Sequence, residues 1–107
     1  MKTHELKIQS QYFWAVVEGK KKAEFRKNDR DFKVGDMLIL KEWIEDEKSF
    51  TSNYVVAVVT DATLLDEWAA GFILISLNLI HQFIDVADRI KREMGKLTPE
   101  QVNYRLL

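Results

Sequence analysis

A run of six residues from Phe72 to Leu77 is apolar at every position except Ser76, and it follows directly on Gly71. Its length suits a strand, and continuous apolarity is typical of a central strand that is covered on both faces. A second segment, Tyr54 to Val59, is rich in the β-branched residues that favour strands. Together the two segments predict a fold built around a β-sheet.

Three further strands are predicted over residues 4–9, 22–26 and 37–43. In the second of these the residues alternate with a period of two, which is expected to turn Ala23 and Phe25 toward the core. The charged residues Lys22, Glu24 and Arg26 then share the opposite face. We therefore expect about five strands, and a charged surface on one of them.

Two helices are predicted from apolar spacing. The first covers residues 11–18, with Ser10 as its N-cap and Gly19 at its end. The second runs from Leu79 to Met94 and carries a clear apolar stripe. A last short helix is expected to begin at residues 98–101, where Thr98 and Gln101 fit a capping box.

The 107 residues are 47% apolar and 31% charged, which is typical of one globular domain. We expect an α+β fold with a small β-barrel over residues 1–78 and a helical extension over residues 79–107 packed on the same domain. Residues 44–53 are polar and are expected to form a hairpin loop, and residues 60–70 remain unassigned.

The composition also argues against several classes of site. There is no cysteine, which excludes disulfides and thiolate zinc sites, and the two histidines have no metal-ligand spacing. We expect no metal and no cofactor. The sequence contains no apolar stretch that predicts a signal peptide or a membrane span, so a cytoplasmic location is expected.

Charge is distributed unevenly, although the net charge is only −1. Residues 19–33 hold seven basic side chains against three acidic ones, and an acidic stretch follows at residues 42–47. Any surface that binds a polyanion must therefore be local. The basic residues of this segment are Lys20, Lys21, Lys22, Arg26, Lys27, Arg30 and Lys33.

The segment Gly19-Lys20-Lys21-Lys22-Ala23-Glu24-Phe25-Arg26 resembles the Gly-x-Lys-x-x-Glu-x-Arg signature of the ASCH domains, which are members of the PUA-like superfamily. The start His4-Glu5-Leu6-Lys7-Ile8 and the centre Arg26-Lys27-Asn28-Asp29-Arg30 resemble a group of small bacterial and phage proteins related to these domains, the DUF3850-like proteins. The resemblance extends from His4 to about Leu77. It implies a curled β-barrel with a cleft beside the first helix, and RNA as the class of ligand.

In such a cleft Lys21, Glu24 and Arg26 form the candidate binding site for RNA or a modified nucleotide. Arg26 would hold a phosphate or a base edge, Lys21 would add a positive charge, and Glu24 would accept from an amino group. Lys27 and Arg30 are included as neighbours, although turn formation also accounts for residues 28–30. The competing interpretation is structural, in which Glu24 and Arg26 only neutralise each other within the sheet.

Aromatic rings that could stack on a base are Tyr12, Trp14, Trp43 and Trp68, most of which are expected in the core.

Two other functions stay open. Some ASCH proteins resemble amidohydrolases of acylated cytidine, and Lys21 matches their lysine, but Glu24 stands where their threonine would be. The other is a phage or accessory protein that binds a protein partner. The helix from Leu79 to Met94 either packs on the barrel or pairs with a second copy in a homodimer.

Overall fold

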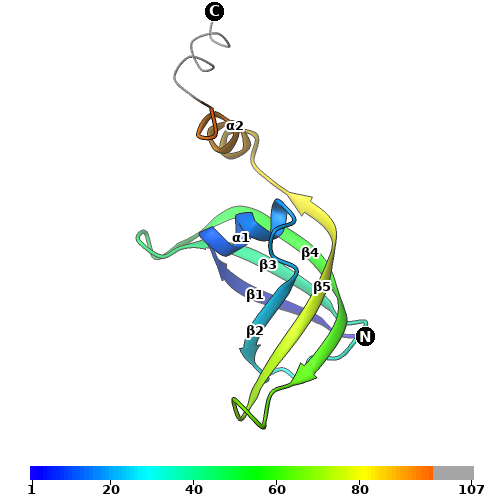
Figure 1. Cartoon of the computed structure of the whole chain (residues 1–107). Helices are drawn as coiled ribbons and strands as arrows, with labels where there is room; N and C mark the ends of the chain where they lie inside the picture. Colours follow the sequence, from blue (N-terminus) through cyan, green and yellow to red (C-terminus); the bar gives the residue numbers. More distant parts are fainter. Residues whose placement is uncertain (98–107) are drawn as a thin grey trace, which may run out of the picture.

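A computed structural model describes residues 1–97 of the chain as a five-stranded sheet with two helices (Figure 1). The predicted α+β class and the number of strands are confirmed. In chain order the elements are β1 (Thr3–Gln9), α1 (Ser10–Val17), β2 (Ala23–Lys27), β3 (Met37–Ile44), β4 (Ser49–Leu64), β5 (Phe72–Phe83) and α2 (Val86–Met94).

The sheet has the order β1-β3-β4-β5-β2, so β1 and β2 are its two edges. β1 pairs in parallel with β3, and the other neighbours are antiparallel. Register shifts interrupt both long hairpins, and such shifts bend strands and increase their twist. The sheet curls into a half-barrel in which the two edges approach each other without pairing (Figure 1).

Helix α1 lies against one end of the half-barrel and contacts β1, β3 and β5 (Figure 1). Its residues Phe13, Trp14 and Val16 are buried, and they join apolar side chains from the concave face of the sheet. Gly19 ends the helix with a φ of 76°, as its position in the sequence predicted. The core side chains come from every strand except β2: Leu6, Ile8, Leu38, Leu40, Val55, Ala57, Val59, Ile73, Ile75 and Leu77, together with Phe32 from the loop before β3.

The predicted helix from Leu79 to Met94 is wrong in its first part. β5 continues to Phe83, because residues up to that point pair with the first half of β4, where Tyr54 lies opposite Phe83. The helix α2 begins only at Val86, and Asp85 caps it by accepting hydrogen bonds from two backbone N–H groups of the first turn. Tertiary strand pairing has thus overridden the helical spacing of residues 79–83. The division of the chain at residue 78 stays a prediction.

Three smaller expectations are also corrected. The loop expected over residues 44–53 is a turn of four residues, 45–48. Residues 60–70 had no predicted structure, and β4 includes the first part of them, up to Leu64. β5 is covered on one face only, since Leu74 is 38% exposed while Ile73 and Ile75 are buried. Ser10 is the first helical residue rather than the cap, and its hydroxyl donates to Glu42.

In the part of the chain that the structure describes, neither helix is long and apolar enough to cross a membrane. The helix predicted at residues 98–101 lies outside the described residues.

Candidate nucleic-acid interface

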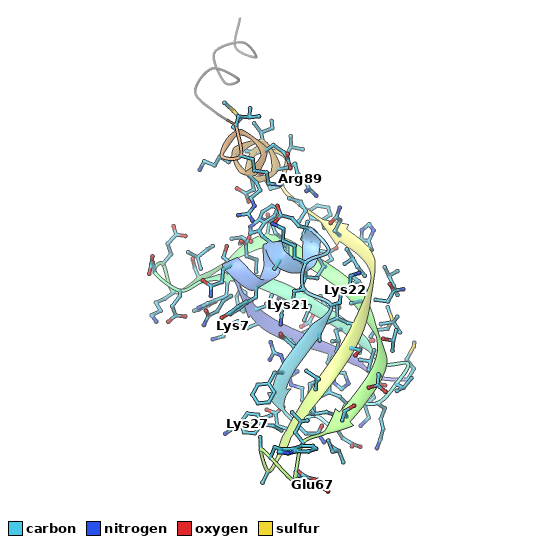
Figure 2. The ribbon with its side chains drawn as sticks, viewed as in Figure 1. Lys7, Lys21, Lys22, Lys27, Glu67 and Arg89 are labelled. Carbon is cyan, nitrogen blue, oxygen red and sulfur yellow. The ribbon has the colours of Figure 1, made fainter. Side chains whose placement is uncertain are left out.

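A cleft of about 470 Å³ lies where the two edges of the sheet approach each other, beside the start of α1. β1 supplies one wall and β2 the other, with Tyr12 from α1 and Phe72 from β5 completing the lining. Three cationic side chains (Lys7, Arg26 and Lys27) and two acidic ones (Glu24 and Asp29) line it. Figure 2 shows Lys7, Lys21 and Lys27 along this side of the half-barrel.

Glu24 lines the cleft, and the structure brings Lys21 and Arg26 into contact with it, although Lys21 itself does not line the cleft. Its two carboxylate oxygens are 3.2 Å from Lys21 Nζ and 3.0 Å from Arg26 Nε. The Glu24 side chain is 10% exposed, whereas those of Lys21 and Arg26 are each 25% exposed. A carboxylate with two cationic partners can be buried at a modest cost, and the cations keep part of their surface toward solvent.

The alternation of β2 was read correctly, but its two faces were assigned the wrong way round. Glu24 is buried and Phe25, expected in the core, is 54% exposed. The reason is the register with β5, where Phe25 pairs with the outward Leu74 and Glu24 with the buried Ile75. Glu24 therefore points into the half-barrel, and its charge is compensated there by Lys21 and Arg26.

Arg26 of β2 and Arg30 of the loop that follows it both bind the backbone of β1, the opposite edge of the sheet. The guanidinium of Arg26 donates to the carbonyl of Lys7, and Arg30 Nη1 donates to the carbonyl of Glu5 at 2.9 Å. Both carbonyls belong to the outer edge of β1, which has no strand partner in the sheet. Arg26 and Arg30 therefore close the half-barrel with side chains, and Arg30 does not line the cleft.

Two lysines of the cleft make no ion pair within residues 1–97. Lys27 is exposed at the end of β2, and Lys7 lies with its Nζ 4.5 Å from the centre of the Trp43 ring. Both are exposed residues, one on each wall of the cleft. They are therefore better placed than Lys21 or Arg26 to meet an anion from solution. Lys7 was missed at the sequence level because it belongs to a regular, alternating strand.

Aromatic rings lie beside the charged side chains of the cleft. Tyr12 is 48% exposed and lies with its ring centre 5.6 Å from Lys21 Nζ. Phe25 and Phe72 stack on each other with centres 5.0 Å apart and planes inclined by 6°. The expectation that most of the candidate rings lie in the core is wrong. Of the four, only Trp14 is buried, Trp43 is half-buried, and Trp68 is 79% exposed on the β4–β5 turn.

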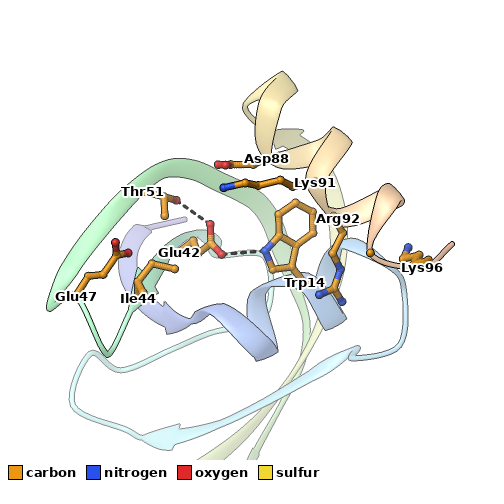
Figure 3. A pocket seen from close by; sticks show the side chains of 10 residues that line it. Trp14, Glu42, Ile44, Glu47, Thr51, Asp88, Lys91, Arg92 and Lys96 are labelled. Atoms are coloured by element: carbon orange, nitrogen blue, oxygen red, sulfur yellow. Dashed lines mark hydrogen bonds between the residues drawn. The ribbon is translucent and has the colours of Figure 1, made fainter. Parts of the chain in front are cut away.

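A larger hollow of about 650 Å³ separates α2 from the half-barrel (Figure 3). Its floor holds Glu42, which is 3% exposed and accepts four hydrogen bonds from neutral donors. These come from Ser10 at 2.5 Å, Trp14 at 2.9 Å, Thr51 at 2.8 Å and Asn53 at 2.9 Å. Because both oxygens are fully occupied, Glu42 joins α1 to β4 and is not available to a ligand.

The two most strongly shifted carboxyl groups lie outside the cleft. Hydrogen bonds from Arg92 and Lys96 lower the pKa of Glu18 to about 2. Contact with His4 and the backbone N–H groups of Lys2 and Lys33 lowers the pKa of Asp36 to about 2. Glu18 is held by ion pairs and Asp36 by hydrogen bonds, and both carboxylates have a structural role at the ends of the half-barrel. In the described residues no group of three His, Asp or Glu side chains is arranged to hold a metal ion.

Comparison with known proteins places the same region in a family. Residues 3–76 match the family model described as "Domain of unknown function (DUF3850)". The chain is also 47% identical over 74 residues to a protein of Escherichia phage P2, the "Uncharacterized 12.9 kDa protein in GpA 3'region". That alignment covers 69% of this chain and 66% of the phage protein, a little under two thirds of its length. The matched residues include β1, α1 and β2, and hence most of the cleft. The chain therefore belongs to the DUF3850 family.

Proposed function

We propose that this domain binds single-stranded RNA or a modified nucleotide in the cleft between β1 and β2. The observation that carries the proposal is the lining of that cleft, where two lysines that form no ion pair with any of residues 1–97 stand beside exposed aromatic rings and a buried carboxylate. Phosphates, bases and base amino groups are the three chemical features that such groups recognise in a nucleotide.

Each group has a role in this proposal. Lys7 and Lys27 neutralise phosphates on the two walls of the cleft. A base stacks on Tyr12 or on the Phe25–Phe72 pair, which contributes about 1–3 kcal/mol for each base. Glu24 accepts a hydrogen bond from the exocyclic amino group of the base, as carboxylates do with cytosine. Lys21 and Arg26 hold Glu24 in place and supply positive potential.

The proposal also assigns the half-barrel to a superfamily of folds. We infer that the half-barrel is a PUA-like domain of the ASCH type, which the Gly19 to Arg26 segment resembles. The support is that this segment leads directly from α1 into β2 and supplies Glu24 and Arg26 to a cleft beside α1, with Lys21 paired to Glu24 from outside the lining.

Fluorescence anisotropy with a labelled ten-nucleotide oligocytidine RNA tests the proposal. Binding should weaken as salt rises, and Lys7→Ala and Lys27→Ala should each reduce the slope of log K against log salt by about 0.7, the value of one lost phosphate contact on a single strand. Lys91→Ala is the matched control, because Lys91 is an exposed lysine on α2, no residue of which lines the cleft. If the two cleft variants bind like the control, the site is wrongly placed.

One observation favours a second function, hydrolysis of an acylated cytidine. The Lys21 amine and the Glu24 carboxylate are in contact at 3.2 Å, and such a pair can act in general acid–base catalysis. Incubation with N4-acetylcytidine tests this alternative. Release of acetate that is abolished by Lys21→Ala would support it, and the absence of any turnover by the unmodified protein would exclude it for this substrate.

A further inference from the structure

The convex, outer face of the sheet carries aromatic and basic side chains next to the cleft. Lys7, Lys41 and Tyr54 each lie between two buried neighbours in their strands, so their side chains point away from the core. Trp43 follows two positions after Lys41 in β3 and lies on the same side. Within residues 1–97 neither helix covers this face, because α1 packs on the concave side and α2 contacts residues of α1 and the segment after it (Figure 1).

Two pairs of rings lie on the outer face. The ring centres of Trp43 and Phe50 are 4.9 Å apart, and those of Tyr54 and Phe83 are 5.5 Å apart with planes inclined by 8°. Phe50 and Phe83 are about half exposed, and Trp43 and Tyr54 are half-buried. Solvent-facing rings on a sheet offer flat surfaces on which unpaired bases can stack.

Two lysines lie among these rings. Lys7 Nζ is 4.5 Å from the centre of the Trp43 ring, and Lys41 Nζ is 5.2 Å from that of Phe50. The strand register also places Lys41 opposite Tyr54, and therefore between the two ring pairs. Neither lysine forms an ion pair with any of residues 1–97, so both positive charges are available to an anion.

Acidic side chains limit the patch to a band that runs across the strands. Glu5 precedes Lys7 by two positions in β1, and Asp46 and Glu47 are exposed on the turn beyond Trp43. Glu45 on the same turn is compensated, since it pairs with Lys48, which lowers its pKa. The Glu45 carboxylate also accepts from the indole N–H of Trp43 at 2.9 Å and so fixes the orientation of that ring.

We propose that this band, formed by Lys7, Lys41, Trp43, Phe50, Tyr54 and Phe83, is a second contact surface for the RNA strand that occupies the cleft. The inference rests on the proposed function. Lys7 connects the two surfaces, because it lines the cleft and also lies over the Trp43 ring. The strand leaves the cleft across β1 and continues over β3 and β4 toward β5.

The chemistry of the band favours a nucleic acid over an apolar protein partner. Lys7 and Lys41 move from the ring faces to the phosphates, which leaves those faces to the bases. An apolar partner would instead bury two ammonium groups that have no carboxylate beside them, and such burial is costly.

Fluorescence anisotropy with the labelled ten-nucleotide oligocytidine tests the proposal. Phe50→Ala should weaken binding by about fivefold or more, the effect of one lost base stack. Lys41→Ala should reduce the slope of log K against log salt by about 0.7. Trp68→Ala and Lys91→Ala are the matched controls, an exposed ring on the β4–β5 turn and an exposed lysine on α2. If Phe50→Ala and Lys41→Ala bind like these controls, the proposal is overturned.

Lys27→Ala separates this proposal from that of the cleft, because Lys27 lines the cleft and lies outside the band. A loss with Lys27→Ala alone keeps the cleft and removes the outer surface, whereas a loss with Phe50→Ala and Lys41→Ala alone keeps the outer surface and removes the cleft. An unmodified protein that binds no RNA overturns both.

A decaglutamate peptide tests the role of the rings, since it is a polyanion without bases. It should displace the labelled RNA at least about tenfold less well than unlabelled oligocytidine does, because it cannot stack. Equal displacement would show that charge alone holds the strand, and the proposed role of the ring pairs would be wrong.

Discussion

Replacing Glu42 by glutamine should destabilise the domain, although the two side chains have nearly the same shape. Both oxygens of Glu42 accept hydrogen bonds, one from Trp14 and Ser10 and the other from Asn53 and Thr51. An amide offers only one oxygen. Whichever way it is turned, its NH₂ group faces either the indole N–H of Trp14 or the NH₂ of Asn53, and neither of these can accept.

The magnitude follows from the number of donors. The hydroxyls of Ser10 and Thr51 can rotate and accept from the new amide, so one donor remains unsatisfied. Leaving one buried donor without a partner costs about 1–3 kcal/mol, and the remaining bonds lose their charge-assisted strength. Because glutamine is uncharged, the substitution also removes the cost of burying a charge that has no cationic partner, and this gain offsets part of the loss. We expect a net loss of about 2 kcal/mol, which lowers the melting temperature of a domain of this size by about 10 °C.

Urea unfolding followed by circular dichroism measures the loss. Glu47→Gln is the matched control, since Glu47 lies at the rim of the same hollow and is exposed, so its change should remain within about 0.5 kcal/mol. If Glu42→Gln is as stable as the unmodified protein, the cost of burying the charge balances or exceeds the value of its hydrogen bonds, and our reasoning about this site is wrong.

Three further predictions concern the ends of the half-barrel and strand β2. Because the pKa of Asp36 is lowered from 3.8 to about 2, its stabilising effect is complete above about pH 4 and is lost as pH falls toward 2; the difference in urea stability between the unmodified protein and Asp36→Asn should shrink over that range. The pKa of Glu18 is likewise lowered from 4.5 to about 2, so Glu18→Gln at pH 7, or acidification of the unmodified protein, should lower the hydrogen-exchange protection factors of the α2 amides and leave those of the sheet unchanged. Phe13→Ala should cost about 3–5 kcal/mol in urea unfolding because Phe13 is fully buried, whereas Phe25→Ala should cost much less; equal losses would contradict the outward position of Phe25.

The strands could be predicted from the sequence because their signals are local. Alternation in β1, β-branched residues in β4 and the apolar run of β5 each need only a few neighbouring residues to be recognised. Gly19 was also predictable, since the end of a helix in the left-handed region favours glycine. The alternation of β2 grouped Glu24 with Arg26, and the resemblance to the ASCH signature added Lys21. The structure does bring the three side chains together.

What could not be predicted depends on partners far away in the sequence. A period of two shows which residues share a face, but only the register with β5 determines that Glu24 points inward and Phe25 outward. The spacing of residues 79–83 fits a helix, and pairing with β4 nonetheless makes them a strand. Lys7 reaches the cleft only because the sheet curls and brings its two edges together.

The most direct test of the proposed ligand site is a titration of the ¹⁵N-labelled protein with the oligocytidine RNA, followed by backbone amide chemical shifts. We predict that the largest changes cluster at residues 7–9, at Tyr12, at residues 24–27 and at Phe72, the two walls of the cleft. Spectra that stay unchanged at millimolar RNA, or changes confined to α2 and the β3–β4 turn, would contradict the assignment of this cleft as a nucleic-acid interface.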